Sequence, residues 1–226
     1  MGGIVAIDGP VAAGKGTVAH ILATKLQGFY LYTGAMYRTV ALLCLRQGIA
    51  LEDKAAVLTV LPQLQMQFEA NRVLQADEDI TEEMMQPSVA SGSSIVAAMP
   101  EVRAALVKLQ QEIGRAKSNA GQIVIIEGRD TATVVFPDAQ VKIFLTARPE
   151  IRAQRRVDQL AAHGELLPLE TVLADVKERD HRDQTRKTDP LVSDPEAAGY
   201  VVVDDSDISK EETVERIIRL IQEKGL

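Results

Sequence analysis

The chain has 226 residues, of which 46% are hydrophobic and 25% are charged. These values are typical of a folded globular protein and exclude the disordered and fibrous classes. Acidic residues outnumber basic ones by 32 to 25, and this net charge of −7 argues against a general nucleic-acid or membrane binder. The single cysteine, Cys44, excludes an intramolecular disulfide, and its place in the apolar helical run 40–45 predicts a buried thiol.

The first residues carry no targeting signal. Met1-Gly2-Gly3 leads directly into an apolar run without a basic leader, and no stretch approaches the roughly 18 apolar residues of a membrane span. One cysteine also suits a reducing compartment. We therefore expect a cytoplasmic protein.

Short runs of Val, Ile and Leu alternate with longer helical patterns. Such runs predict strands buried on both faces, as in a parallel sheet. They lie at residues 4–7, 29–32, 123–126, 141–145 and 200–203. Helical spacing follows Pro100 and recurs along residues 214–221. The pattern predicts an α/β fold with a five-stranded parallel sheet flanked by helices.

Residues 34–113 interrupt this alternation. Leu64, Met66 and Phe68 alternate with polar residues, and after a predicted turn at 70–71 the apolar pattern resumes at 73–74. This predicts a small, half-exposed antiparallel sheet within an insertion between the second and third core strands. The predicted core is then residues 1–33 and 114–226. Residues 163–165, between two charged helices, are typical of a short mobile loop.

A glycine-rich segment at residues 9–17 joins the first strand to the first helical pattern. Such a turn lets backbone N–H groups surround phosphate oxygens, and Lys15 can reach the terminal phosphates. The strict P-loop pattern has Ser or Thr directly after the lysine, whereas here Gly16 precedes Thr17. The context still predicts an ATP-binding loop formed by Gly9, Pro10, Val11, Ala12, Ala13, Gly14, Lys15, Gly16 and Thr17.

Arginines follow several of the other predicted elements. Transfer of a phosphoryl group between two phosphates needs such cations to converge. Arg38 follows the second strand and Arg129 the third, and we expect both strands to end beside the first, at the edge where ligands bind. Two charged helices carry Arg152, Arg155, Arg156 and the run 179–186. The alternative to a binding site is that Arg38 and the three helical arginines lie on solvated surfaces. Asp183 and Arg186 would then form only an intrahelical pair.

Four motifs in order make the pattern specific. They are Gly-Pro-x-x-x-Gly-Lys-Gly-Thr, Thr-Gly-Ala-Met-Tyr-Arg, Gly-Arg-Asp-x-x-Thr-Val-Val-Phe-Pro-Asp-Ala and Arg-Asp-x-Arg-Asp. Together, over essentially the whole chain, they resemble the bacterial cytidylate kinases. The resemblance implies a core, a nucleotide-monophosphate-binding insertion over 34–113 and a lid over 156–168. It also implies transfer of the γ-phosphate of ATP to CMP or dCMP with Mg²⁺, in which Lys15, Arg129 and Arg186 are catalytic.

The same resemblance assigns substrate contacts. The acceptor phosphate would meet Thr33, Arg38, Arg129 and Arg186; cytosine would meet Ser94, Arg103 and Asp130; and the sugar would meet Arg179 and Asp183. Arg152, Arg155 and Arg156 would approach ATP, with Thr17 near the phosphates and Mg²⁺. Two departures from the family pattern are Tyr32, where Asp is usual, and Thr131-Ala132, where a small apolar pair ending in Gly is common.

Other functions stay open at this point. One is a kinase for another small acceptor, such as AMP, UMP or a non-nucleotide acid. Another is a regulatory nucleotide-binding module without turnover, which the arginine set disfavours. We expect a monomer that binds small-molecule substrates, but neither nucleic acid nor membranes. His20, His163 and His181 lack metal-ligand spacing, so no zinc site is predicted.

Overall fold

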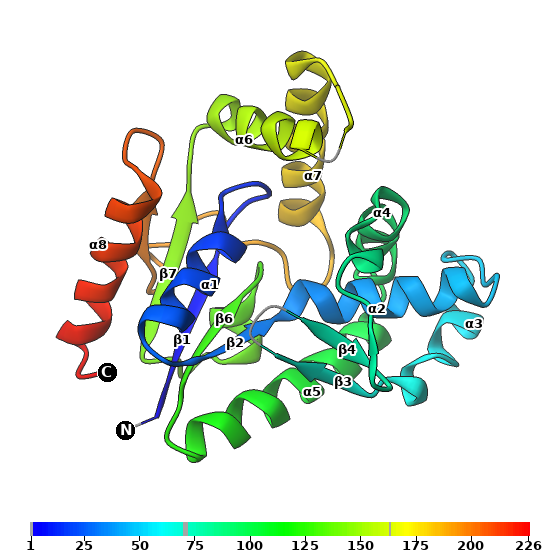
Figure 1. The fold of residues 1–226 in the computed structure, drawn as a ribbon, viewed down its shortest axis with the longest axis horizontal. Coiled ribbons are helices and arrows are strands. Elements are labelled where there is room, and N and C mark those ends of the chain that lie inside the picture. The colour runs from blue at the N-terminus through cyan, green and yellow to red at the C-terminus, as the bar shows by residue number, and fades with distance from the viewer. Residues whose placement is uncertain (1, 70–71, 163) are drawn as a thin grey trace.

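A five-stranded parallel sheet forms the centre of the molecule (Figure 1). The computed structural model describes residues 2–69, 72–162 and 164–226. The strand order is β2-β6-β1-β7-β8, and every neighbouring pair is parallel. The strands are β1 (Gly3–Asp8), β2 (Phe29–Tyr32), β6 (Ile123–Glu127), β7 (Val141–Thr146) and β8 (Val201–Asp204). The predicted α/β class and five-stranded sheet are confirmed.

Helices cover both faces of this sheet, which explains the unbroken apolar runs. Val5 and Ile7 of β1 pack with α1 (Lys15–Lys25) and α8 (Lys210–Glu223). The alternate residues of β1 face the short helix η3 (Thr131–Val135) and α5 (Pro100–Asn119). The prediction of burial on both faces is wrong for β8, an edge strand whose Val201 is 40% exposed.

The order of the strands differs from the expectation in one respect. β6 lies between β1 and β2, so the second strand does not end directly beside the first. β6 pairs with both neighbours, with Glu127 level with Ile7 on one side and with Tyr32 on the other. The residues that follow β6 therefore lie between the glycine-rich loop after β1 and the helix that follows β2.

The segment between β2 and β6 forms a second layered unit, to the right in Figure 1. It contains the predicted antiparallel pair and a third strand of two exposed residues, which have no apolar alternation to predict them. The predicted turn at 70–71 lies outside the described residues. Cys44 is buried in its core, as predicted. Its elements are α2 (Thr33–Arg46), α3 (Lys54–Leu58), η1 (Leu61–Gln63), β3 (Met66–Phe68), β4 (Val73–Gln75), β5 (Glu78–Asp79), η2 (Glu83–Met85), α4 (Pro87–Val96) and α5.

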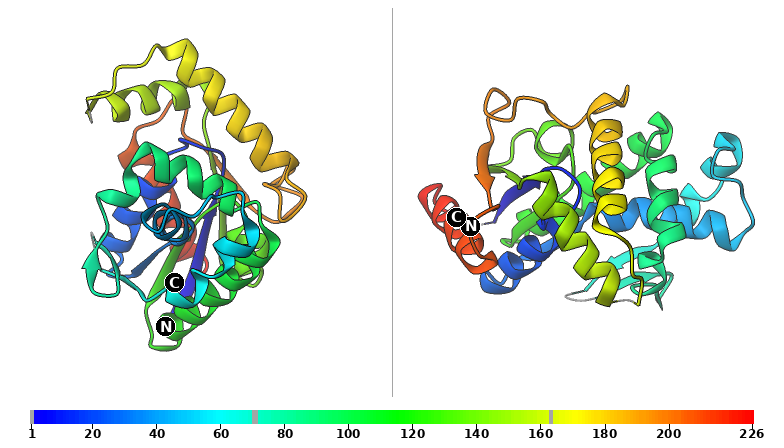
Figure 2. Two further views of the ribbon diagram at one scale, coloured as in Figure 1. Left: turned by 90° about the vertical axis from the view of Figure 1, so that its right-hand side faces the viewer. Right: turned by 90° about the horizontal axis from the view of Figure 1, so that it is seen from above.

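Helices α6 (Pro149–Ala162) and α7 (Leu169–Thr185) form a hairpin above the loop between β1 and α1 (Figure 2). Their shared core is small, with three buried residues, Ala153, Val172 and Val176. Leu166, in the connection between them, is 85% exposed. His163, part of the predicted loop, lies outside the described residues. Within the described part of the chain, every helix is too short or too polar to cross a membrane.

Candidate active site

The glycine-rich loop wraps tightly around the end of β1. Gly9 has a φ of 150°, and a Cβ there would lie 2.0 Å from the carbonyl oxygen of Leu145, so only glycine fits. Gly14 has a φ of 83° and precedes the first residue of α1. The loop therefore presents the N-terminus of α1, which is the kind of backbone site that binds phosphate.

Lys15 is folded into this loop. Its Nζ donates to the carbonyl oxygen of Pro10 at 2.7 Å, and the side chain is buried. Burial and the positive charge of Arg129 lower the pKa of Lys15 to about 7, although Glu127 and Asp8 act in the opposite direction. An ammonium in this position gains strongly from a phosphate that brings negative charge to it.

Arginines and Thr33 from several elements gather around the end of β6, and Arg129 is the one whose charge acts on Lys15. Arg129 Nε donates to Asp183 Oδ2 at 2.7 Å, which joins the end of β6 to α7. Thr33, the first residue of α2, donates to the carbonyl oxygen of Glu127 at 2.7 Å. Arg38 lies five residues further along α2, and Arg186 follows the end of α7.

Arg179 is the least satisfied of these cations. Its Nε is buried and has no hydrogen-bond partner among the described residues. Burial, followed by the nearby charges of Arg129, Arg38 and Arg156, lowers the pKa of Arg179 to about 10, against an opposing effect of Asp183. Such a gathering of like charges around an unpaired donor indicates a binding site for an anionic group.

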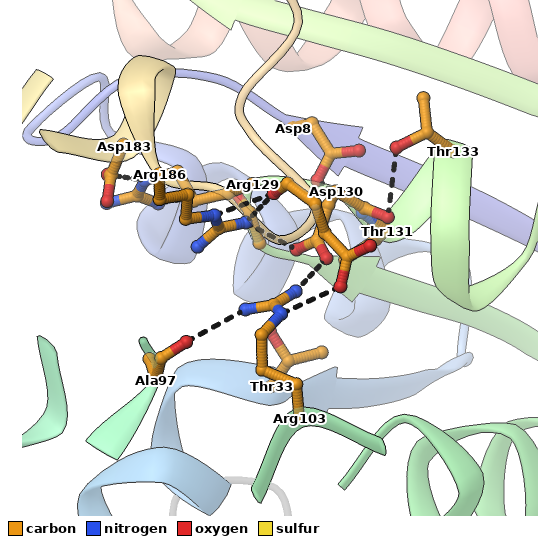
Figure 3. Close-up of polar contacts among 12 residues, drawn as sticks. Asp8, Thr33, Ala97, Arg103, Arg129, Asp130, Thr131, Thr133, Asp183 and Arg186 are labelled. Carbon is orange, nitrogen blue, oxygen red and sulfur yellow. Dashed lines mark hydrogen bonds and ion pairs between the residues drawn. The ribbon is translucent and has the colours of Figure 1, made fainter. Parts of the chain in front are cut away.

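A second polar cluster contains Arg103 and Asp130, two of the three residues assigned to cytosine (Figure 3). Arg103 of α5 pairs with the Asp130 carboxylate through Nη2 and with Asp189 Oδ2 through Nε at 2.8 Å. Arg186 Nη2 lies 3.5 Å from the other Asp130 oxygen. Ser94 is half-buried on α4, and no hydrogen bond joins it to Arg103 or Asp130 within the described residues.

The three arginines of α6 have different surroundings. Arg152 is 4% exposed, donates to the carbonyl oxygens of Ala147 and Val11, both at 2.9 Å, and pairs with Asp180 at 2.7 Å. It therefore holds the glycine-rich loop against α7. Which of the three arginines contacts ATP stays a prediction. Arg155 pairs with Asp205 at 2.9 Å, and its Nη1 lies next to Gly14 of the glycine-rich loop. Arg156 is half-buried with no ion pair among the described residues.

Asp8 is a structural carboxylate that sequence reasoning overlooked. Its Oδ1 accepts from the backbone and hydroxyl of Thr131, at 2.9 and 2.8 Å, and its Oδ2 accepts from Ala132 N at 2.8 Å and Tyr200 Oη at 2.7 Å. It thereby fixes the segment that carries Arg129 and Asp130. The sequence did contain a signal for this role: Asp8 ends a strand that is otherwise apolar, and a carboxylate buried there without partners would be costly.

The departure at Tyr32 changes the surroundings of Arg38. The Arg38 guanidinium lies over the Tyr32 ring, 5.8 Å from its centroid, and the ring stacks on Tyr30 at 5.9 Å. A Cβ on Gly34 would lie 2.8 Å from the same ring, so the ring is closely packed. Thr131-Ala132, the other departure, supplies three of the four hydrogen bonds to Asp8.

Thr17 lies exposed in the first turn of α1. Mg²⁺ prefers few protein oxygen ligands together with substrate phosphates, and a hydroxyl beside a phosphate-binding loop suits that chemistry. The described residues contain no cluster of three His, Cys, Asp or Glu side chains arranged for a metal. The Thr17 hydroxyl fits a metal that is held mainly by the phosphates of a nucleotide.

The chain is similar to known proteins over nearly its whole length. The family model for cytidylate kinase matches residues 5–223. A cytidylate kinase from Caldanaerobacter subterraneus subsp. tengcongensis is 44% identical over 219 residues, covering 96% of this chain and 94% of the relative. A cytidylate kinase from Pelotomaculum thermopropionicum is 45% identical over 221 residues, covering 95% and 93%.

A solved structure shows the same fold at low sequence identity. It is an uncharacterized protein from Eubacterium ventriosum, 13% identical, with a TM-score of 0.54 and coverage of 97% of this chain and 98% of that chain. This likeness concerns the fold alone. The family model and the two relatives span nearly the whole chain, and the chain belongs to the cytidylate kinase family.

Proposed function

We propose that this protein transfers the γ-phosphate of ATP to CMP or dCMP with Mg²⁺, giving ADP and CDP or dCDP. The observation that carries the proposal is the gathering of Arg38, Arg129 and Arg179, with too few carboxylates to leave every donor paired, next to a phosphate-binding loop. A protein that bound ATP alone would need no second cationic site. The kinase family supports the same reaction.

Catalysis rests on position and charge in this proposal. The glycine-rich loop and Lys15 hold the donor phosphates, while Thr33, Arg38, Arg129 and Arg186 hold the acceptor phosphate in line with them. Arg179 and Asp183 bind the sugar. Since the acceptor phosphate is already anionic, no general base and no covalent enzyme intermediate are needed. Mg²⁺, held by ATP phosphates and Thr17, would neutralise charge on the transferred group.

Cytosine would be read by Arg103 and Asp130, with Ser94 beside them. Cytosine has an amine donor and an adjacent unprotonated ring nitrogen, whereas uracil has a carbonyl and an N–H at the same positions. A carboxylate that accepts from the amine and a guanidinium that donates to the ring nitrogen fit cytosine and oppose uracil at both atoms. Mismatched polar partners should give discrimination of about 100-fold.

We also propose that residues 34–113 bind the monophosphate, that residues 156–168 act as a lid, and that the enzyme is a cytoplasmic monomer. The small apolar core of the α6–α7 hairpin supports movement there, because few apolar contacts would be lost on opening. Exposed Leu166 and Leu167 lie in the proposed lid. Limited proteolysis with and without both nucleotides tests the lid: protection by nucleotides supports it, and equal cleavage contradicts it.

The reaction itself is tested by an acceptor panel. ADP release is measured with CMP, dCMP, UMP, AMP and GMP, for the wild type and for Asp130→Ala. The expected result is turnover with CMP or dCMP, and a CMP-to-UMP ratio that collapses in the variant. Turnover only with AMP would mark a different kinase, and ATP binding without turnover on any acceptor would mark a regulatory module. Equal losses on CMP and UMP would mean that Asp130 does not read the base.

A further inference from the structure

Arg103 is held by two carboxylates at once. Its side chain is 3% exposed, and it shares Asp130 and Asp189 as partners. Asp130 accepts from Nη2, whereas Asp189 Oδ2 accepts from Nε at 2.8 Å. The aromatic ring of Tyr37 lies 5.8 Å from the guanidinium carbon. The two carboxylates therefore accept from different nitrogens, so loss of one bond leaves the donor of the other in place.

Asp189 adopts an unusual backbone conformation to make its contact. Its φ is 49°, in the left-handed region, and it immediately precedes Pro190. A residue before proline favours extended backbone, and a positive φ is uncommon outside glycine, although Asp and Asn tolerate it best. Arg186 Nε donates to the Asp189 carbonyl oxygen at 2.6 Å. The backbone of Asp189 is thus bound by one arginine of the site and its side chain by another.

Recognition of cytosine requires an exchange of partners at Asp130. On the proposed function, the Asp130 carboxylate must accept from the cytosine amine, and Arg103 must donate to the ring nitrogen. Both groups are paired with each other in the structure. An exchange that left the buried guanidinium with no carboxylate would be costly. Asp189 lowers this cost, because its bond to Nε keeps one carboxylate on the guanidinium when Asp130 turns away. Nη2 is then released for the base, while Nη1 stays with the carbonyl oxygen of Ala97 at 3.5 Å.

We propose that Asp189 is a positioning residue that determines base specificity by holding Arg103 in place while Asp130 turns to cytosine. The inference rests on the proposed function, since it gives Asp189 a part only in reading the base. Loss of the carboxylate should therefore affect CMP more than UMP, because the ring nitrogen of uracil carries a proton and cannot accept from Arg103. A contact that merely stabilised the fold would change both substrates alike.

The side chain and the backbone of Asp189 can be tested separately. Asp189→Gly removes the carboxylate without strain at a positive φ, and the carbonyl that accepts from Arg186 stays. Asp189→Asn tolerates the same backbone and keeps an oxygen for Arg103 Nε, but without the charge. Asp175→Asn is a matched control, since Asp175 is an exposed carboxylate on α7 outside the site. Thermal melting of each variant confirms that it is folded.

The experiment measures kcat/KM for CMP and UMP. For Asp189→Gly we expect kcat/KM for CMP to fall about tenfold, as for loss of a hydrogen bond to a charged group, and kcat/KM for UMP to fall by less than about threefold. Asp189→Asn should recover part of the loss, and Asp175→Asn should match the wild type. An unchanged CMP-to-UMP ratio in the Gly variant, or in the Asn variant if the Gly variant does not fold, overturns the inference alone. A wild type with no preference for CMP overturns the base-reading assignment and the role of Asp189 together.

Discussion

Arg152 and Asp180 form an ion pair, 2.7 Å between Nη1 and Oδ2, that joins α6 to α7 directly beside the glycine-rich loop. The other Asp180 oxygen accepts from Val11 N at 3.1 Å, and Arg152 donates to Val11 O at 2.9 Å. The backbone N–H and the carbonyl oxygen of Val11 are thus both bound by this ion pair. The loop that binds phosphate and the helices above it are therefore connected through Arg152 and Asp180.

Removal of one partner should cost stability as well as activity. Arg152→Ala leaves a largely buried carboxylate uncompensated, and we expect the free energy of unfolding to fall by about 3–5 kcal/mol, measured by urea denaturation. Arg156→Ala is the matched control on the same helix; it should change stability by less than about 0.5 kcal/mol and raise KM for ATP. If Arg152→Ala kept full stability and only raised KM for ATP, Arg152 would be an ATP ligand, as its position in the sequence first suggested.

Much of the fold follows from short-range sequence patterns, whereas these contacts do not. Apolar runs predict the five strands, and glycine positions predict the phosphate loop, because strands and tight turns depend on burial and local backbone geometry. Arg152, Arg155 and Arg156 carry the same charge and lie within five residues of one helix. Only tertiary packing therefore distinguishes the buried arginine from the other two. The contact between Arg103 and Asp189 joins residues 86 positions apart, and its backbone conformation has no local signal beyond an Asp before proline.

Lys15→Ala should reduce turnover by orders of magnitude and leave the fold intact. The left-handed turns of the loop need Gly9 and Gly14, whereas Lys15 contributes one hydrogen bond, from Nζ to the carbonyl oxygen of Pro10. Because burial lowers the pKa of Lys15, its ammonium is unfavourable in the folded protein, and its loss should not lower the melting temperature near or below pH 7. Steady-state kinetics and thermal melting check both parts. Near-normal turnover in this variant would contradict the role of the loop.

Variants of Tyr32 should separate the ring from the hydroxyl. Tyr32→Phe keeps the aromatic face below Arg38, so KM for CMP should stay within about threefold of the wild type. Tyr32→Ala removes a cation–π contact of about 1–2 kcal/mol, and KM should rise about 5–30-fold for CMP and UMP alike, since Arg38 is assigned to the phosphate. A change in the CMP-to-UMP ratio would instead connect Tyr32 to the base site.

The preference for cytosine should depend on pH through Asp130. Burial raises the pKa of Asp130 to about 6, and the opposing charges of Arg103 and Arg186 offset it only in part. Protonation adds an O–H donor to the carboxyl and removes its charge, so it accepts less well from the cytosine amine. Selectivity for CMP should therefore be complete above about pH 7 and decline as the pH falls through 6.

The ratio of kcat/KM for CMP to that for UMP isolates this effect. Titration of the acceptor phosphate, of Lys15 and of ATP enters both values equally and cancels in the ratio. From about pH 8 to pH 5 we expect the wild-type ratio to fall with a midpoint near the pKa of Asp130, about 6. Asp130→Asn carries no titratable group at that position and should give a low ratio that does not change with pH. A wild-type ratio that stays constant over this interval would mean that the charge on Asp130 takes no part in reading the base.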